Sequence, residues 1–240
     1  MGDWDSPGTL AFVLDSPQGL SSTAQRFLRE NACRVEFDRE LTGEELRRDM
    51  LTVNGFVDEE LLILLDRIQV RYGGLSYPSG YFGNTVEFTP VCEPEMGEEL
   101  HISYAVQSGT AAGAQLNRDG AVEVCFEDKG LLEFPSLDNV IEWDAAFAKA
   151  KSMRVFKTFY LPDSITFEEV NARLRRIAPD TMPISETWGH RSWWFAGPNF
   201  ALGACRVWRD LELIMPPVAY IGADDAAILA DALKELHGHS

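Results

Sequence analysis

Apolar residues recur at helical spacing in six stretches of the chain, and the clearest stretch runs from Val57 to Tyr72. Its apolar residues share one face, because side chains three and four positions apart are neighbours on a helix. It begins with three acids, which the helix dipole favours, and it ends before Gly73, a residue type that tolerates the left-handed angles of a helix stop. The six predicted helices span residues 22–31, 42–54, 57–72, 136–149, 166–178 and 224–236.

Between the third and fourth predicted helices the pattern changes to short apolar runs separated by turns. The turn from Asn117 to Gly120 ends in Asp-Gly, a hairpin signal because glycine supplies the positive φ that many turns require. Successive strands with no helix between them are typical of an antiparallel sheet. The predicted strands span residues 33–40, 83–89, 100–107, 115–116, 121–126, 155–160, 193–195, 200–208 and 211–214.

These elements predict an α+β protein in which an antiparallel sheet is flanked by helices and followed by a C-terminal strand–helix extension. With 240 residues, 45% of them hydrophobic, the chain can bury a sizeable core. A new series of strands and helices begins near residue 155. We therefore expect a domain over residues 1–155, with a helical preamble, and an α+β extension over 156–240 packed on it. A single domain over 1–240 is the alternative, since domains typically have about 100–200 residues.

The charge of the chain limits its partners. It has 38 acids against 21 bases, a formal net charge of −17. Such a field opposes binding to nucleic acid, which depends on Lys and Arg neutralising phosphates, and it also opposes binding to anionic membranes. It favours basic partners through electrostatic steering. Acidity that serves solubility alone is the alternative.

The acids concentrate in the region of the predicted sheet. Between Tyr72 and Pro135 there are ten acids and two bases, and no Lys or Arg occurs from Tyr72 to Asn117. Aromatic residues are interleaved with these acids. Aromatic anchors beside charge of one sign are typical of a protein-binding surface, although the same aromatics can belong to the core. The predicted partner-binding residues are Tyr81, Glu93, Glu95, Glu98, Glu99, Glu127 and Asp128.

The sequence contains no motif typical of catalysis or metal binding. The histidines and cysteines show neither HExxH nor any zinc-binding spacing, and there is no GxSxG elbow or phosphate-binding glycine loop. We therefore expect no enzymatic activity, no metal and no cofactor. A glycosidase-like pair needs only two carboxyls about 5–10 Å apart, so a carboxylate-dependent hydrolase stays open as an alternative.

Several features predict a cytoplasmic protein. Residues Met1 to Pro7 include two Asp and no Lys or Arg, unlike the basic start of an export signal. No apolar run approaches the roughly 20 residues needed to cross a bilayer. The four cysteines are scattered without a CxxC, which indicates reduced thiols and suits the cytosol.

Residues 57–147 resemble the SUKH superfamily, whose bacterial members are mostly immunity proteins of polymorphic toxin systems. The segments that carry the resemblance are RYGGL (71–75), FEDKG (126–130) and FPSLDNVIE (134–142), the last of which looks like the closing helix of the family. The resemblance implies a helix-flanked antiparallel sheet that binds a cognate toxin domain, often a nuclease, in a stoichiometric complex. It implies no catalytic residues.

Charge and resemblance together predict an immunity protein that neutralises a basic toxin domain through an acidic, aromatic-bearing surface. A regulatory or scaffold protein with no toxin partner is a second possibility, and the neighbouring genes would distinguish it. A carboxylate-dependent hydrolase is a third, and it would require two acids with opposed environments in a deep pocket.

Overall fold

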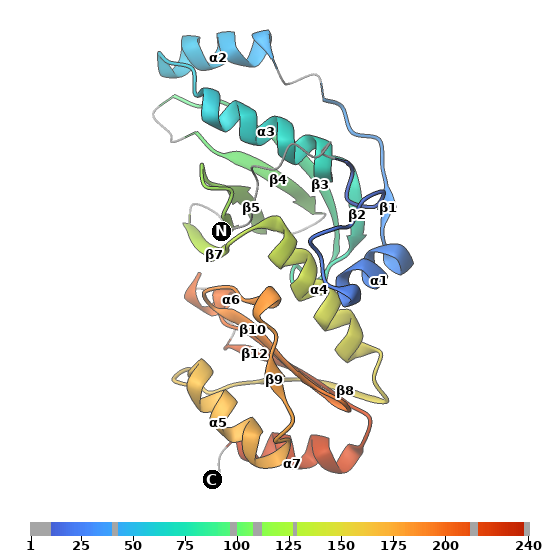
Figure 1. Cartoon of the computed structure of the whole chain (residues 1–240). Coiled ribbons are helices and arrows are strands. Elements are labelled where there is room, and N and C mark those ends of the chain that lie inside the picture. Colours follow the sequence, from blue (N-terminus) through green and yellow to red (C-terminus); the bar gives the residue numbers. More distant parts are fainter. Residues whose placement is uncertain are drawn as a thin grey trace.

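The computed structural model describes residues 11–39, 43–96, 100–107, 112–126, 129–211 and 216–237. Two antiparallel sheets lie one above the other in Figure 1, and the helix α4 (Leu137–Lys151) passes between them. The predicted class, an α+β protein with an antiparallel sheet flanked by helices and a C-terminal strand–helix part, is confirmed. None of the helices in the described ranges is both long and apolar enough to cross a membrane.

The first sheet is a seven-stranded meander in which each strand pairs with the next one along the chain. The turn from Asn117 to Gly120 forms as predicted, with Gly120 at a φ of 76° and its N–H donating to the Asn117 carbonyl at 2.9 Å. Two strands, β2 and β7, were not predicted, and β1 is much shorter than the predicted run 33–40. The strands are β1 (Cys33–Arg34), β2 (Leu75–Pro78), β3 (Thr85–Val91), β4 (Ile102–Gln107), β5 (Ala112–Leu116), β6 (Val122–Phe126) and β7 (Lys129–Phe134).

Along β3, one face of the first sheet is buried and the other is exposed. On β3, Val86 and Phe88 are buried while Thr85 and Glu87 are exposed, which is the alternation of an antiparallel sheet with one face in water. Helices cover the buried face and contribute to the same core. They are α1 (Ser22–Asn31), α2 (Glu44–Asn54), α3 (Glu59–Tyr72) and α4.

The second sheet has the strand order β8-β12-β11-β10-β9, and all its pairs are antiparallel. The capping box predicted at Thr166 forms with Glu169 and starts α5. Strand β12 was not predicted, the predicted strand 200–208 ends at Cys205, and residues 212–214 of the predicted strand 211–214 lie outside the described residues. The elements are β8 (Val155–Tyr160), α5 (Phe167–Ile177), β9 (Met182–Pro183), η1 (Ser185–Thr187), β10 (Ser192–Gly197), β11 (Phe200–Cys205), α6 (Val207–Asp210), β12 (Val218–Ala223) and α7 (Ala226–His237).

The two faces of the second sheet pack against different helices. Adjacent tryptophans on β10 point to opposite faces, as expected for neighbours on a strand. Trp194 lies edge-on to Trp143 of α4, with 5.4 Å between ring centroids, whereas Trp193 lies 5.7 Å from Phe167 of α5. One core therefore continues from the first sheet through α4 to the second sheet, and a smaller core lies under α5 and α7.

The first sheet ends at Phe134 and the second begins at Val155, so the expected boundary near residue 155 coincides with the start of β8. The division of the chain into two domains stays a prediction. Helix α4 approaches β12 at backbone contact distance, because a Cβ added at Gly222 would lie 2.3 Å from the Ala150 carbonyl oxygen. Glycine at residue 222 therefore sets how closely the helix and the sheet can pack.

We expect Gly222→Ala to lower the free energy of unfolding by about 1–3 kcal/mol or more, because the added methyl group meets a backbone carbonyl that cannot rotate away. Gly113→Ala on β5 is the matched control, since nothing lies within 4 Å of its added Cβ. Urea unfolding followed by circular dichroism measures both variants. Equal losses of stability in the two variants would contradict a close approach of α4 to β12.

Candidate functional site

Tyr81 is a core residue, so the prediction that it contacts a partner is wrong. Its side chain is 3% exposed, and its ring packs edge-on against Phe134 and Trp143, each at 5.0 Å between centroids. The connection between β2 and β3 folds against α4, where the Tyr81 N–H donates to Asp144 at 2.9 Å. The density of acids in the sequence does not indicate which way the Tyr81 side chain points. That direction depends on contacts with residues far along the chain.

Glu93 and Glu95 are exposed, in agreement with a role at the surface, and lie in the connection between β3 and β4. The Asn54 side chain, at the end of α2, donates to the Glu95 carbonyl at 3.4 Å. Burial, together with the charges of Asp58 and Glu93, raises the pKa of the Cys92 thiol to about 11. The β3–β4 connection therefore lies beside the junction of α2 and α3. Four other predicted residues lie outside the described part of the chain: Glu98, Glu99, Glu127 and Asp128.

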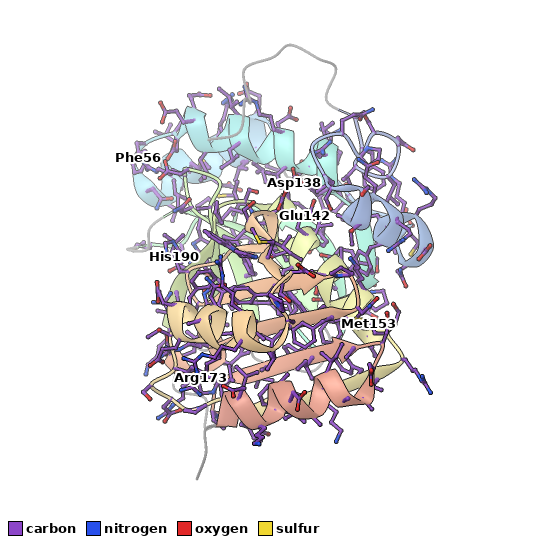
Figure 2. The ribbon with its side chains drawn as sticks, turned by 60° about the horizontal axis from the view of Figure 1, so that its bottom comes forward. Phe56, Asp138, Glu142, Met153, Arg173 and His190 are labelled. Atoms are coloured by element: carbon purple, nitrogen blue, oxygen red, sulfur yellow. The ribbon has the colours of Figure 1, made fainter. Side chains whose placement is uncertain are left out.

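Three exposed apolar side chains accompany these acids. Leu51 is 57% exposed, Phe56 47% and Met96 86%. Leu51 stands three residues before Asn54 and so shares a helix face with it, and Figure 2 shows Phe56 at the outer edge of the molecule. We name Leu51, Phe56, Glu93, Glu95 and Met96 the α2–α3 corner. Sequence reasoning missed the apolar members, because an exposed apolar residue at a helix end leaves no periodic signal.

The acids next to the α2–α3 corner already have partners. Asp58 caps α3 by accepting from the Leu61 N–H at 3.1 Å, and its other oxygen lies 2.7 Å from Arg118. Glu59 forms an exposed ion pair with Arg47 at 2.8 Å, and such pairs contribute only about 0–1 kcal/mol. Within the described ranges, Glu93 and Glu95 form no ion pair, so their charges are available to a partner.

A cavity of about 330 Å³ lies near the α2–α3 corner, between α3, the turn from Asn117 to Gly120 and the start of α4. Leu64, Ile68 and Leu137 provide its more buried apolar side. Its volume is at the lower end of the range of small-ligand pockets, which also suits a single side chain of a partner. Its exposed charged residues have both signs, so the cavity favours neither a simple anion nor a simple cation. These residues are Glu60, Arg67, Arg118 and Asp119.

Asp144 is a buried carboxyl whose ionisation is strongly perturbed. Burial raises its pKa to about 7, although hydrogen bonds from neighbouring groups lower it. Its Oδ1 accepts from the Ser79 hydroxyl at 3.0 Å and from the Tyr81 N–H at 2.9 Å. Asp144 therefore holds the β2–β3 connection against α4.

Glu133, on β7, is a second buried carboxyl. Burial raises its pKa to about 7, against the lowering effect of hydrogen bonds from Ser192 and the Arg191 backbone. The Arg191 N–H lies 3.2 Å from each carboxyl oxygen, and the His190 N–H donates to the Glu133 carbonyl at 2.7 Å. Glu133 therefore joins the edge of the first sheet to the segment that leads into β10.

These buried carboxyls do not form the open acid pair that a hydrolase requires. Neither Glu133 nor Asp144 lines the cavity at α3. A smaller cavity, of about 120 Å³, is lined by Glu142, whose carboxyl oxygens accept from the Ser21 N–H at 2.5 Å and the Ser21 hydroxyl at 2.6 Å. Among the described residues, no three His, Cys, Asp or Glu side chains are grouped so that they could hold a metal ion.

The buried carboxyls predict that stability falls as the pH rises. Both pKa values increase on folding, from ordinary values of 3.8 for Asp144 and 4.5 for Glu133 to about 7. The folded protein then binds more protons than the unfolded chain, so each group removes about 1.4 kcal/mol of stability per pH unit between about pH 5 and 7. Chemical unfolding at pH 5, 6, 7 and 8 measures this slope.

The double variant Asp144→Asn and Glu133→Gln should show a flatter dependence of unfolding free energy on pH than the unmodified protein. Glu168→Gln, an exposed acid on α5, is the matched control. An unchanged slope in the double variant would refute the assignment of the pH dependence to these two carboxyls.

Comparison with protein-family models found no match, and neither curated proteins nor solved structures gave one. The resemblance of residues 57–147 to the SUKH superfamily therefore stays a prediction, and the function is argued from the geometry of this chain.

Proposed function

We propose that this protein is a cytoplasmic immunity protein that binds a basic toxin domain at the α2–α3 corner and neutralises it without catalysis. The observation that carries the proposal is the combination of exposed Phe56 and Met96 with Glu93 and Glu95, which form no ion pair with any described residue. The resemblance to the SUKH superfamily supports the same reading, and a nuclease domain fits it because such domains present basic surfaces to nucleic acid.

The apolar members of the corner would provide affinity. Covering an exposed Phe or Met side chain contributes about 1.5–3 kcal/mol, and a few such anchors carry most of the energy of a protein interface. Met96 is 86% exposed, so nearly all of its side chain is available to a partner. The cavity lined by Leu64 and Leu137 offers a recess nearby for a side chain of that partner.

The acids of the corner, Glu93 and Glu95, would steer the approach of a basic partner. Charge complementarity mainly increases the association rate and excludes partners of the same sign. Because Glu93 and Glu95 are exposed, salt should screen their contribution over a Debye length of about 8 Å at physiological ionic strength. The complex should therefore form more slowly at high salt.

The test begins by capturing the partner from the native cells with the tagged full chain at low and high salt. The captured protein is then expressed alone in bacteria. Growth arrest that is relieved by co-expression of this chain is the expected outcome. A stoichiometric partner that does not harm the cells would instead favour a regulatory or scaffold protein, and the immunity function would be rejected.

The purified partner allows the corner to be tested by binding kinetics. We expect Glu93→Lys with Glu95→Lys to lower the association rate by about ten-fold at low salt, and Phe56→Ala with Met96→Ala to raise the dissociation rate by about ten-fold or more. Glu168→Lys with Asp231→Lys is the matched control, since both acids are exposed on α5 and α7 and the change in net charge is the same. Indistinguishable rates for the corner and control variants would show that the partner binds elsewhere.

A further inference from the structure

Strand β8 has a free edge that the rest of the described chain leaves unpaired. Of the four edge strands, β1 and β9 have two residues each. Strand β7 is partly covered, because its Leu132 and Glu133 carbonyls accept hydrogen bonds from Arg191 and His190. Among the described strands, β8, with six residues, pairs with β12 on one side only.

The register shows which backbone groups face outward. The Leu161 N–H donates to the Pro217 carbonyl at 2.8 Å, and the alternation of antiparallel pairing then places Phe159, Lys157 and Val155 in hydrogen-bonded pairs with β12. The intervening residues direct their N–H and C=O groups to the free edge. These residues are Phe156, Thr158 and Tyr160, and no described residue bonds their outward groups.

The edge is also basic, in contrast to the rest of the chain. No acid occurs from Ala145 to Pro162, although the net charge of the protein is −17. The bases of this stretch are exposed and form no ion pair with the described residues. They are Lys149 and Lys151 at the end of α4, Arg154 in the connection, and Lys157 on β8. Figure 2 shows the connection at the side of the molecule, where Met153 is labelled.

We propose that the free edge of β8 binds an extended acidic segment of another protein, which adds a sixth strand to the second sheet. Strand addition satisfies the outward backbone groups and takes its specificity from alternate side chains. Acids on one face of the added strand would lie beside Lys157, and its other face would cover Tyr160, which is 57% exposed.

A second copy of this chain is a poor occupant of the same edge. Two copies paired through β8 would bring their basic stretches together, and like charges on adjacent strands are destabilising. Lysine on an edge strand is a common means of preventing such self-association. The charge that repels a second copy is the charge that attracts an acidic strand, and the proposal does not depend on the function of the α2–α3 corner.

The probe is a seven-residue peptide in which Glu and Val alternate. Fluorescein is attached to its N-terminus, and its C-terminus is amidated. Anisotropy should show binding to the full chain that weakens with salt. Thr158→Pro should weaken binding by about ten-fold or more, because proline removes an outward N–H without removing an internal hydrogen bond. Lys157→Glu should weaken it similarly, whereas the Glu93→Lys and Glu95→Lys variant should bind as the unmodified protein does.

Two controls make the result decisive. The same peptide with alternate N-methylated residues should not bind, and this measurement uses only the unmodified protein in case Thr158→Pro fails to fold. Equal binding of a Lys-Val peptide, of the N-methylated peptide, or of a folded Thr158→Pro variant would overturn the proposal. A dimer in sedimentation that Thr158→Pro abolishes would overturn it in favour of a second copy.

Discussion

The packing of α4 against both sheets is the contact on which the rest of the structure depends. Trp143 shows this directly, since its ring lies 5.0 Å from Tyr81 on the side of the first sheet and 5.4 Å from Trp194 of the second. Edge-on ring pairs of this kind contribute about 0.5–1.5 kcal/mol each beyond the area that they bury. Because packed interiors are dense and deform little, the position of α4 determines how the two sheets face each other.

The packing of both sheets against α4 also buries polar groups in the interior. The connection between β2 and β3 turns against α4, and Asp144 accepts the Tyr81 N–H there; Glu133 does the same for Arg191 where the second sheet meets the first. A buried N–H without a partner costs about 1–3 kcal/mol. Each carboxyl avoids that cost at the expense of its own desolvation, and the raised pKa values of Glu133 and Asp144 reflect this compromise.

The sequence predicted what depends on neighbouring residues and missed what depends on distant ones. Helix α5 was predicted because its capping box and apolar face lie within one segment. Strand β12 (Val218–Ala223) was missed because helices cover both of its faces, which removes the alternation expected of a strand. In the candidate site, charge density pointed to Glu93, which is exposed, whereas the burial of Tyr81 follows from Asp144, which lies 63 residues away.

The α2–α3 corner and the β8 edge carry exposed groups of opposite charge on different sheets of the molecule. Figure 1 shows α2 and α3 at the top, beyond the first sheet, and β8 in the second sheet, with the first sheet and α4 between them. Interactions between exposed charges fade beyond a Debye length of about 8 Å, so each proposed surface would act on its own approaching partner. An acidic corner with apolar anchors favours a folded basic domain, whereas a basic strand edge favours an extended acidic chain, because backbone pairing requires a strand. On these two proposals, α4 would join two different modes of recognition through one packed core.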